Sequence, residues 1–196
     1  KRMGSAEEVA NLVLFLLSLA GLAAFVDSPQ DPARDGPLLQ KAKELAATGP
    51  EHALLARLAG DWNVVWTTHA TGSEAKEERG RATGSLLLGG RYVQVLFRMQ
   101  AGQVPVQAMQ LFGFDTLRQQ FTSSWRDDLS TWSVECHGPR PEAGAEPGVF
   151  ELQGTVGDVH DPTGRPFRMR VQVQDAAIAI ELRDTLDGRE HVVQRQ

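Results

Sequence analysis

Hydrophobic and polar residues alternate with a period of two over most of the chain from Gly60 onward. Such alternation is typical of β-strands that bury one face and expose the other. The segment 91–99 shows it most clearly. The glycine pair 89–90 in front of it predicts a tight turn, because glycine takes positive φ without a Cβ penalty. The residues expected on the buried face of this strand are Val93, Val95, Phe97 and Met99.

The same pattern repeats between short turns rich in Gly, Asp and Pro, and it predicts about ten strands. Consecutive strands of this kind form an antiparallel meander, and so many of them normally curl and close. We therefore expect an all-β antiparallel barrel. The expected strands cover residues 60–67, 77–87, 91–99, 104–115, 121–127, 131–136, 149–156, 167–174, 177–183 and 190–195.

The region before the strands has a different pattern and predicts helices. Residues 38–47 are helix-like, Gly49 and Pro50 interrupt the chain, and a second short helix is expected over residues 51–58. The length of 196 residues suits one globular domain with an extension. The expected parts are a hydrophobic segment over residues 1–26, a linker and helix over 27–49, and the barrel domain over 50–196.

Residues 9–26 are almost entirely apolar, and Lys1 and Arg2 place positive charge in front of them. A polar stretch with two prolines follows. A basic start followed by an apolar core resembles a signal peptide or a short membrane anchor. This interpretation predicts a protein that is exported or anchored in the bacterial envelope, with membrane contact through residues 9–26. A cytoplasmic protein is the alternative.

Two other interpretations of this segment are open. Residues 2–18 resemble the C-terminal helix segment of short-chain dehydrogenases, where Glu-Glu-Val-Ala precedes an apolar helix that ends in Leu-x-Ser. The chain lacks the glycine-rich cofactor loop and the Tyr-x-x-x-Lys pair of those enzymes. That resemblance therefore implies a fusion remnant without dehydrogenase chemistry. The third interpretation is an amphipathic helix with Ser5 as its N-cap, packed on the barrel or on a neighbour.

Composition narrows the classes of function. The formal net charge is -5 and Lys and Arg are scattered among acidic residues, so nothing predicts a basic surface for nucleic acid. A single cysteine, Cys136, excludes an internal disulfide and a cysteine-based metal site. Cys136 and His137 fall on opposite faces of a strand, so we expect a buried structural thiol and not half of a nucleophile–base pair.

Five short motifs follow one another along the strand-forming part of the chain: Leu58–Trp62, Leu88–Tyr92, Gly113–Asp115, Trp125–Asp127 and Asp161–Pro166. Together they resemble a bacterial domain-of-unknown-function family, number fifteen-seventy-nine, from about Pro50 to the C-terminus. Members of that family look like lipocalin and calycin barrels, so the resemblance implies a calycin-like fold. It also gives Trp62 a structural role at one barrel end. The family has no agreed activity.

An apolar lumen would be lined by large side chains on the inward faces of the strands. Arg168 and Arg170 share one strand face, and if that face pointed inward they would clamp a carboxylate ligand. The ordinary barrel pattern has the opposite face inward, with Phe167 and Val171, and leaves both arginines in solvent. The other ligand-binding candidates are Trp66, Phe97, Phe112, Trp132 and Met169.

The sequence predicts no catalytic residue, metal site or cofactor. Its five histidines lie in different elements without His-x-His or His-Glu-x-x-His spacing. An enzyme would need a His and an Asp at one barrel mouth, for instance His69 with Asp127. The neighbouring carboxylates of Asp127 and Asp128 are more simply explained as turn caps.

Three hypotheses follow for the function. The first is a module that binds a small apolar molecule inside the barrel. The second is a ligand-free structural or interaction module of the envelope, which forms a homodimer through the 91–99 strand. The third is a hydrolase or isomerase of a hydrophobic substrate with its site at the barrel mouth. The sequence favours the first and leans away from an enzyme, since no motif supports one.

Overall fold

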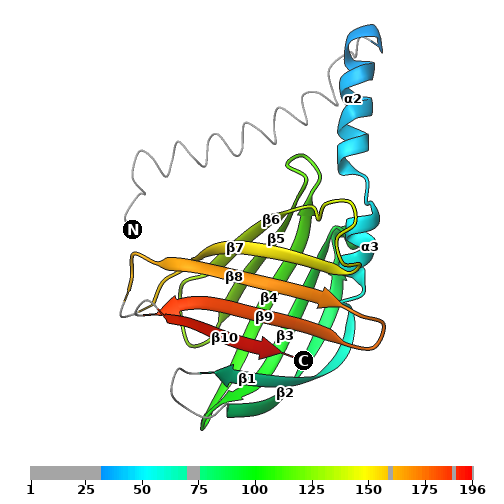
Figure 1. Cartoon of the computed structure of the whole chain (residues 1–196). Coiled ribbons are helices and arrows are strands. Elements are labelled where there is room, and N and C mark those ends of the chain that lie inside the picture. The colour runs from blue at the N-terminus through cyan, green and yellow to red at the C-terminus, as the bar shows by residue number, and fades with distance from the viewer. Residues whose placement is uncertain (1–31, 70–75, 159–160, 187–188, 196) are drawn as a thin grey trace, which may run out of the picture. The chain divides into compact units, whose positions relative to one another are not determined.

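The computed structural model describes residues 32–69, 76–158, 161–186 and 189–195. Its ten strands form a closed antiparallel barrel in which each strand pairs with the next and β1 pairs with β10 (Figure 1). The strands are β1 Gly60–His69, β2 Lys76–Leu87, β3 Tyr92–Ala101, β4 Val104–Asp115, β5 Gln120–Asp127, β6 Val134–Pro139, β7 Val149–Val156, β8 Arg165–Val173, β9 Ile178–Leu186 and β10 Arg189–Arg195. The predicted all-β barrel of about ten strands is confirmed.

The sixth strand differs from its prediction, which placed it over residues 131–136. β6 begins at Val134, because the preceding residues form a turn held by side chains. The Asp127 carboxylate accepts a hydrogen bond from the Leu129 N–H at 3.1 Å, and the Ser130 hydroxyl donates one to the Trp132 carbonyl at 3.3 Å. The period-two spacing of Trp132 with Val134 therefore does not place both residues in one strand.

The predicted tight turn before β3 is present over residues 88–90. Gly89 and Gly90 have φ values of 68° and 82°, a region that L-residues with a Cβ rarely adopt. In the strand that follows, Val93, Val95 and Phe97 are buried, as their alternation predicts. The turn thus sets which face of β3 enters the core.

Helix α3, Pro50–Ala56, packs against β3 and β4. Leu55 on the helix and Leu58 just after it are fully buried in the core. The buried His52 accepts a hydrogen bond from the Gly49 N–H through Nδ1 at 3.1 Å, and its ring lies edge-on to Phe114 with centroids 5.9 Å apart. This helix therefore closes the barrel end at which β4 finishes.

The other described helix, α2 Pro32–Ala46, belongs to a separate compact unit that ends at Ala47. It starts six residues earlier than the predicted helix over 38–47 and contains Pro37. Pro32 begins the helix, where the N–H it lacks would have no partner, whereas Pro37 lies in the second turn and removes one hydrogen bond of the helix. The expected segment 1–26 lies outside the described residues, and no helix within those residues is long and apolar enough to span a membrane.

Candidate ligand-binding site

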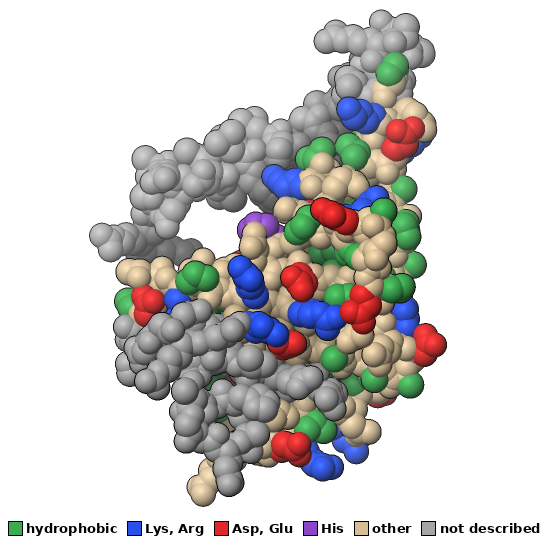
Figure 2. All heavy atoms as spheres, in the orientation of Figure 1, with side chains coloured by type: hydrophobic (Ala, Val, Ile, Leu, Met, Phe, Trp, Pro, Cys, Tyr) green, Lys and Arg blue, Asp and Glu red, His purple; other side chains and the backbone are tan. Residues whose placement is uncertain are grey.

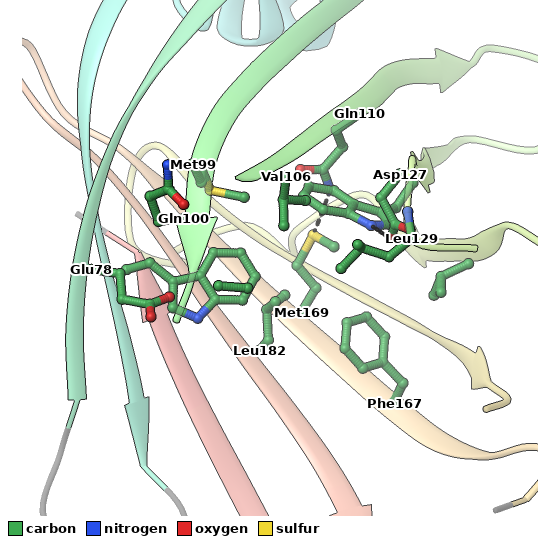
Figure 3. A pocket seen from close by; sticks show the side chains of 14 residues that line it. Glu78, Met99, Gln100, Val106, Gln110, Asp127, Leu129, Phe167, Met169 and Leu182 are labelled. Carbon is green, nitrogen blue, oxygen red and sulfur yellow. Dashed lines mark hydrogen bonds between the residues drawn. The ribbon is translucent and has the colours of Figure 1, made fainter. Parts of the chain in front are cut away.

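A cavity of about 380 Å³ lies inside the barrel, at the end where β3 turns into β4. Its walls are mainly apolar and come from many strands, as Figure 3 shows. The apolar side chains that line it are Trp66 of β1, Met99 of β3, Val106 of β4, Trp125 of β5, Val134 of β6, Phe167 and Met169 of β8, and Leu182 of β9. The inward faces that the alternation predicted therefore surround an open volume at this end.

Gln110 of β4 is the most buried polar residue of the cavity wall, with an exposed fraction of 0%. Its Nε2 donates a hydrogen bond to the Ser123 hydroxyl at 2.9 Å and a weaker one to the Met169 sulfur at 3.4 Å. Only the NH₂ group of an amide has two hydrogens to give, so this orientation suits both acceptors. Its Oε1 is buried and has no hydrogen-bond partner among the residues that the structure describes. The cavity wall thus carries an unused acceptor.

Two carboxylates, Glu78 and Asp127, also line the cavity. Glu78 accepts hydrogen bonds from the Lys76 ammonium at 2.7 Å and from the Gly102 N–H, and the Lys76 hydrogen bond is the main cause of its lowered pKa. Asp127 accepts hydrogen bonds from the Trp125 indole N–H at 2.9 Å and the Leu129 N–H. Both donors to Asp127 are neutral N–H groups, so among the described residues no cation pairs with its carboxylate.

A second, smaller cavity of about 140 Å³ lies toward the α3 end and shares no lining residue with the first. Phe97 lines the small cavity and Trp125 lines the large one, and their ring centroids are 5.4 Å apart. This aromatic pair stands between the two spaces. The two cavities are therefore lined by separate sets of residues that meet at this pair.

The structure separates the predicted ligand-binding residues into three groups. Trp66 and Met169 line the large cavity, whereas Phe97 and Phe112 line the small one. Trp132 is 46% exposed and borders a shallow surface depression. The expectation that Trp132 walls the lumen is corrected, since it lies in the turn before β6 and not in the strand.

Arg168 and Arg170 occupy the outward face of β8. Phe167, Met169 and Val171 are buried on its inward face, and the Arg170 guanidinium forms an ion pair with Glu146 at 2.7 Å. The alternative pattern, with inward apolar residues and solvated arginines, is the observed one. The predicted carboxylate clamp inside the lumen does not form, because both arginines lie on the outer face of the barrel.

The described residues give little support to nucleophilic or metal chemistry. Cys136 is buried in β6, burial raises the pKa of its thiol to about 12, and His137 is exposed on the other face. No cluster of metal-ligating side chains occurs among the described residues. The side chains of His69 and His191, and the whole of His160, lie outside them, so the pairing of His69 with Asp127 stays a prediction.

The sequence interpretation missed Gln110 and Glu78. A signal for Gln110 was present, because Val106, Ala108, Gln110 and Phe112 alternate on one face of β4 and only one of them is polar. Glu78 gave no such signal. It lines the cavity because β2 runs beside the β3–β4 turn, a contact that depends on tertiary structure.

Fold and cavity together define a small antiparallel β-barrel protein with a mainly apolar pocket in its lumen. Residues 47–191 match the profile of the family described as protein of unknown function (DUF1579). The chain belongs to this family, as the five sequence motifs indicated. A search of curated proteins finds no match.

Proposed function

We propose that this protein binds one small, mainly apolar molecule in the large lumen cavity. The observation that supports this most is the cavity itself. Protein interiors are normally packed as densely as organic crystals, with few voids larger than a water molecule. A space of about 380 Å³ falls within the range of roughly 300–1,000 Å³ for small-molecule sites. The cavity opens at one end of the barrel, and an apolar occupant would remove its mainly apolar walls from water, which is favourable.

The type of barrel supports the same proposal. Calycin-like barrels are antiparallel meanders of a size that leaves room for one small ligand at most. Here aromatic rings pack together toward the α3 end and leave a cavity of only about 140 Å³, while the other end keeps one of about 380 Å³. Aromatic and thioether side chains at that end, those of Trp66, Trp125 and Met169, provide a polarizable surface for an apolar molecule.

A direct test uses the full chain and a neutral fluorescent dye such as Nile red. We expect saturable binding with one dye per chain, and quenching of the tryptophan emission because Trp66 and Trp125 line the cavity. Val106→Trp should fill the cavity and abolish binding. The matched control is Leu96→Trp on the outer face of β3, where the side chain is 47% exposed. A folded Val106→Trp variant that binds dye as well as wild type would refute the proposal.

A second candidate is an interaction module that forms a homodimer. Leu96 and Tyr92 are exposed apolar residues on the outer face of β3 and favour a contact there. β3 is paired on both sides, with β2 and β4, so such a contact would use its face and not its edge. Light scattering of the full chain should then show a dimer that Leu96→Glu dissociates; a monomeric wild type excludes this candidate.

Surface charge gives no reason to prefer a highly charged partner. Figure 2 shows basic and acidic side chains next to one another over the visible face of the barrel. Among the described residues several exposed charges form ion pairs, for instance Arg126 with Glu135 and Arg183 with Glu181. Exposed ion pairs of this kind contribute little to stability and leave a mixed surface.

A further inference from the structure

We infer that the molecule held in the large cavity is an uncharged amphiphile that donates one hydrogen bond from a hydroxyl group to Gln110. This inference rests on the proposed function and narrows its ligand class. It excludes a fatty-acid anion, the ligand that the arginine pair on β8 suggested from sequence. Two independent features of the cavity wall carry it: the unused acceptor of Gln110 and the carboxylates of Glu78 and Asp127.

The unpaired oxygen of Gln110 is best satisfied by a ligand that carries a hydrogen-bond donor. Figure 3 shows the Gln110 amide in the cavity wall near Val106 and Met169, with the marked contact from its nitrogen to the Met169 sulfur. Both hydrogens of Nε2 have acceptors, in Ser123 and Met169, so the amide is fixed and its oxygen is left over. A buried acceptor without a partner costs free energy, and a ligand that supplies a donor recovers it.

Gln110 is also placed where a structural role alone does not explain it. Its neighbours on the inward face of β4, Ala108 and Phe112, are apolar and buried. A methionine would fill the same space without an unpaired oxygen. An amide with a satisfied nitrogen and an open oxygen is the arrangement that recognises a hydroxyl and rejects an ether of the same shape.

The second feature selects against negative charge. Glu78 and Asp127 line the same cavity, and hydrogen bonding holds the pKa of Glu78 below its ordinary value, so that carboxyl is ionised at neutral pH. Lys76 balances Glu78 but its side chain is 63% exposed, whereas the bonds to Asp127 from the described residues come from the neutral N–H groups of Trp125 and Leu129. A carboxylate ligand would meet like charge here and lose its hydration.

The test compares three probes with the same number of carbon atoms: decanol, its isomer methyl nonyl ether and decanoate, each used to displace Nile red from the full chain. At about pH 8 the carboxyl group of decanoate is ionised. We expect decanol to bind about fivefold more tightly than the ether, as one additional hydrogen bond implies. We expect decanoate to bind more weakly than decanol by about tenfold or more.

Substitutions test which side chains cause these differences in affinity. Gln110→Met should remove the preference for decanol over the ether. Asp127→Asn combined with Glu78→Gln should strengthen decanoate binding several-fold while decanol stays within about twofold. The control is Asp128→Asn, because Asp128 is exposed, bonds the Gln107 N–H outside the cavity and should change nothing.

The outcomes separate this inference from the proposed function. If none of the three probes displaces the dye and the dye itself does not bind, the proposed function fails. If decanol and the ether bind wild type equally, water satisfies Gln110 and the inference fails while lumen binding stands. Decanoate binding more tightly than decanol overturns the charge argument. If Gln110→Met does not fold, the order of the affinities of the wild-type protein for the three probes tests the inference by itself.

Discussion

The two ends of the barrel lumen use similar residues for opposite purposes. At the α3 end, Phe114 meets Phe121 edge-on with centroids 5.0 Å apart, Phe121 stacks on Phe150 at 4.3 Å, and Leu55 belongs to the same buried core. At the β3–β4 end, Trp66, Trp125 and Phe167 surround a cavity. Aromatic content alone therefore does not tell a filled core from a binding site; the difference lies in whether a helix covers the barrel end.

This contrast predicts that the filled end contributes more to stability than the open end. Phe121→Ala should lower the free energy of unfolding by about 3–5 kcal/mol, because a large buried ring leaves a cavity in a packed cluster. Phe167→Ala, beside the existing cavity, should cost distinctly less. Urea denaturation of both variants measures this, and equal losses would show that the two ends are equally packed.

Backbone contact at the filled end gives the next largest effect. A Cβ added to Gly84 would lie 2.0 Å from the Leu58 carbonyl oxygen, which is backbone and has little room to move. Gly84→Ala should therefore destabilise the protein by roughly 2 kcal/mol or more, as overpacking does. Ser85→Ala, an exposed neighbour in the same strand, is the control and should stay within about 0.5 kcal/mol of wild type.

The histidine at the filled end makes stability depend on pH. Burial is the main cause of the lowered pKa of His52, opposed by nearby Glu51 and assisted by Arg91. The folded state thus binds this proton less readily than the unfolded state, whose histidine titrates near 6.5. The contribution of His52 is complete above about pH 6.5 and falls as the pH is lowered further. Urea denaturation at several pH values should show this loss in wild type, and a smaller one in His52→Gln.

The smallest effect is expected at the open end. Gln110→Met removes the unpaired oxygen, which stabilises, and the Ser123 hydrogen bond, which destabilises. These changes oppose each other, so the free energy of unfolding should stay within about 1 kcal/mol of wild type. Thermal unfolding of the unliganded chain checks this. A loss of several kcal/mol would mean that Gln110 holds the wall together and is not reserved for a ligand.

Most of the fold could be predicted because alternation records which side of each strand is buried. β3 is the clearest case, where Val93, Val95 and Phe97 face the core as their spacing requires. Prediction failed at Trp132 because the alternation of Trp132 with Val134 crosses the boundary between a turn and β6. The alternation of apolar and polar residues does not show at which residue side-chain hydrogen bonds to the backbone end a strand.

The candidate site was less predictable than the fold. Trp66 and Met169 were found because large apolar residues on inward faces must lie in the lumen. Which of these residues touch an open volume depends on how far neighbouring side chains reach, and the sequence does not contain that. Phe112 has the same pattern as Met169, yet it is fully buried and lines only the small cavity.

The Phe97–Trp125 pair gives the lumen one further property. Because these rings stand between the two cavities and α3 covers the far end, the route to the large cavity that the described residues leave open is the one at the β3–β4 end. A molecule held there leaves by the route by which it entered, moving in the opposite direction. Uptake and release therefore share one barrier, and any change that slows entry at the β3–β4 turn slows exit equally.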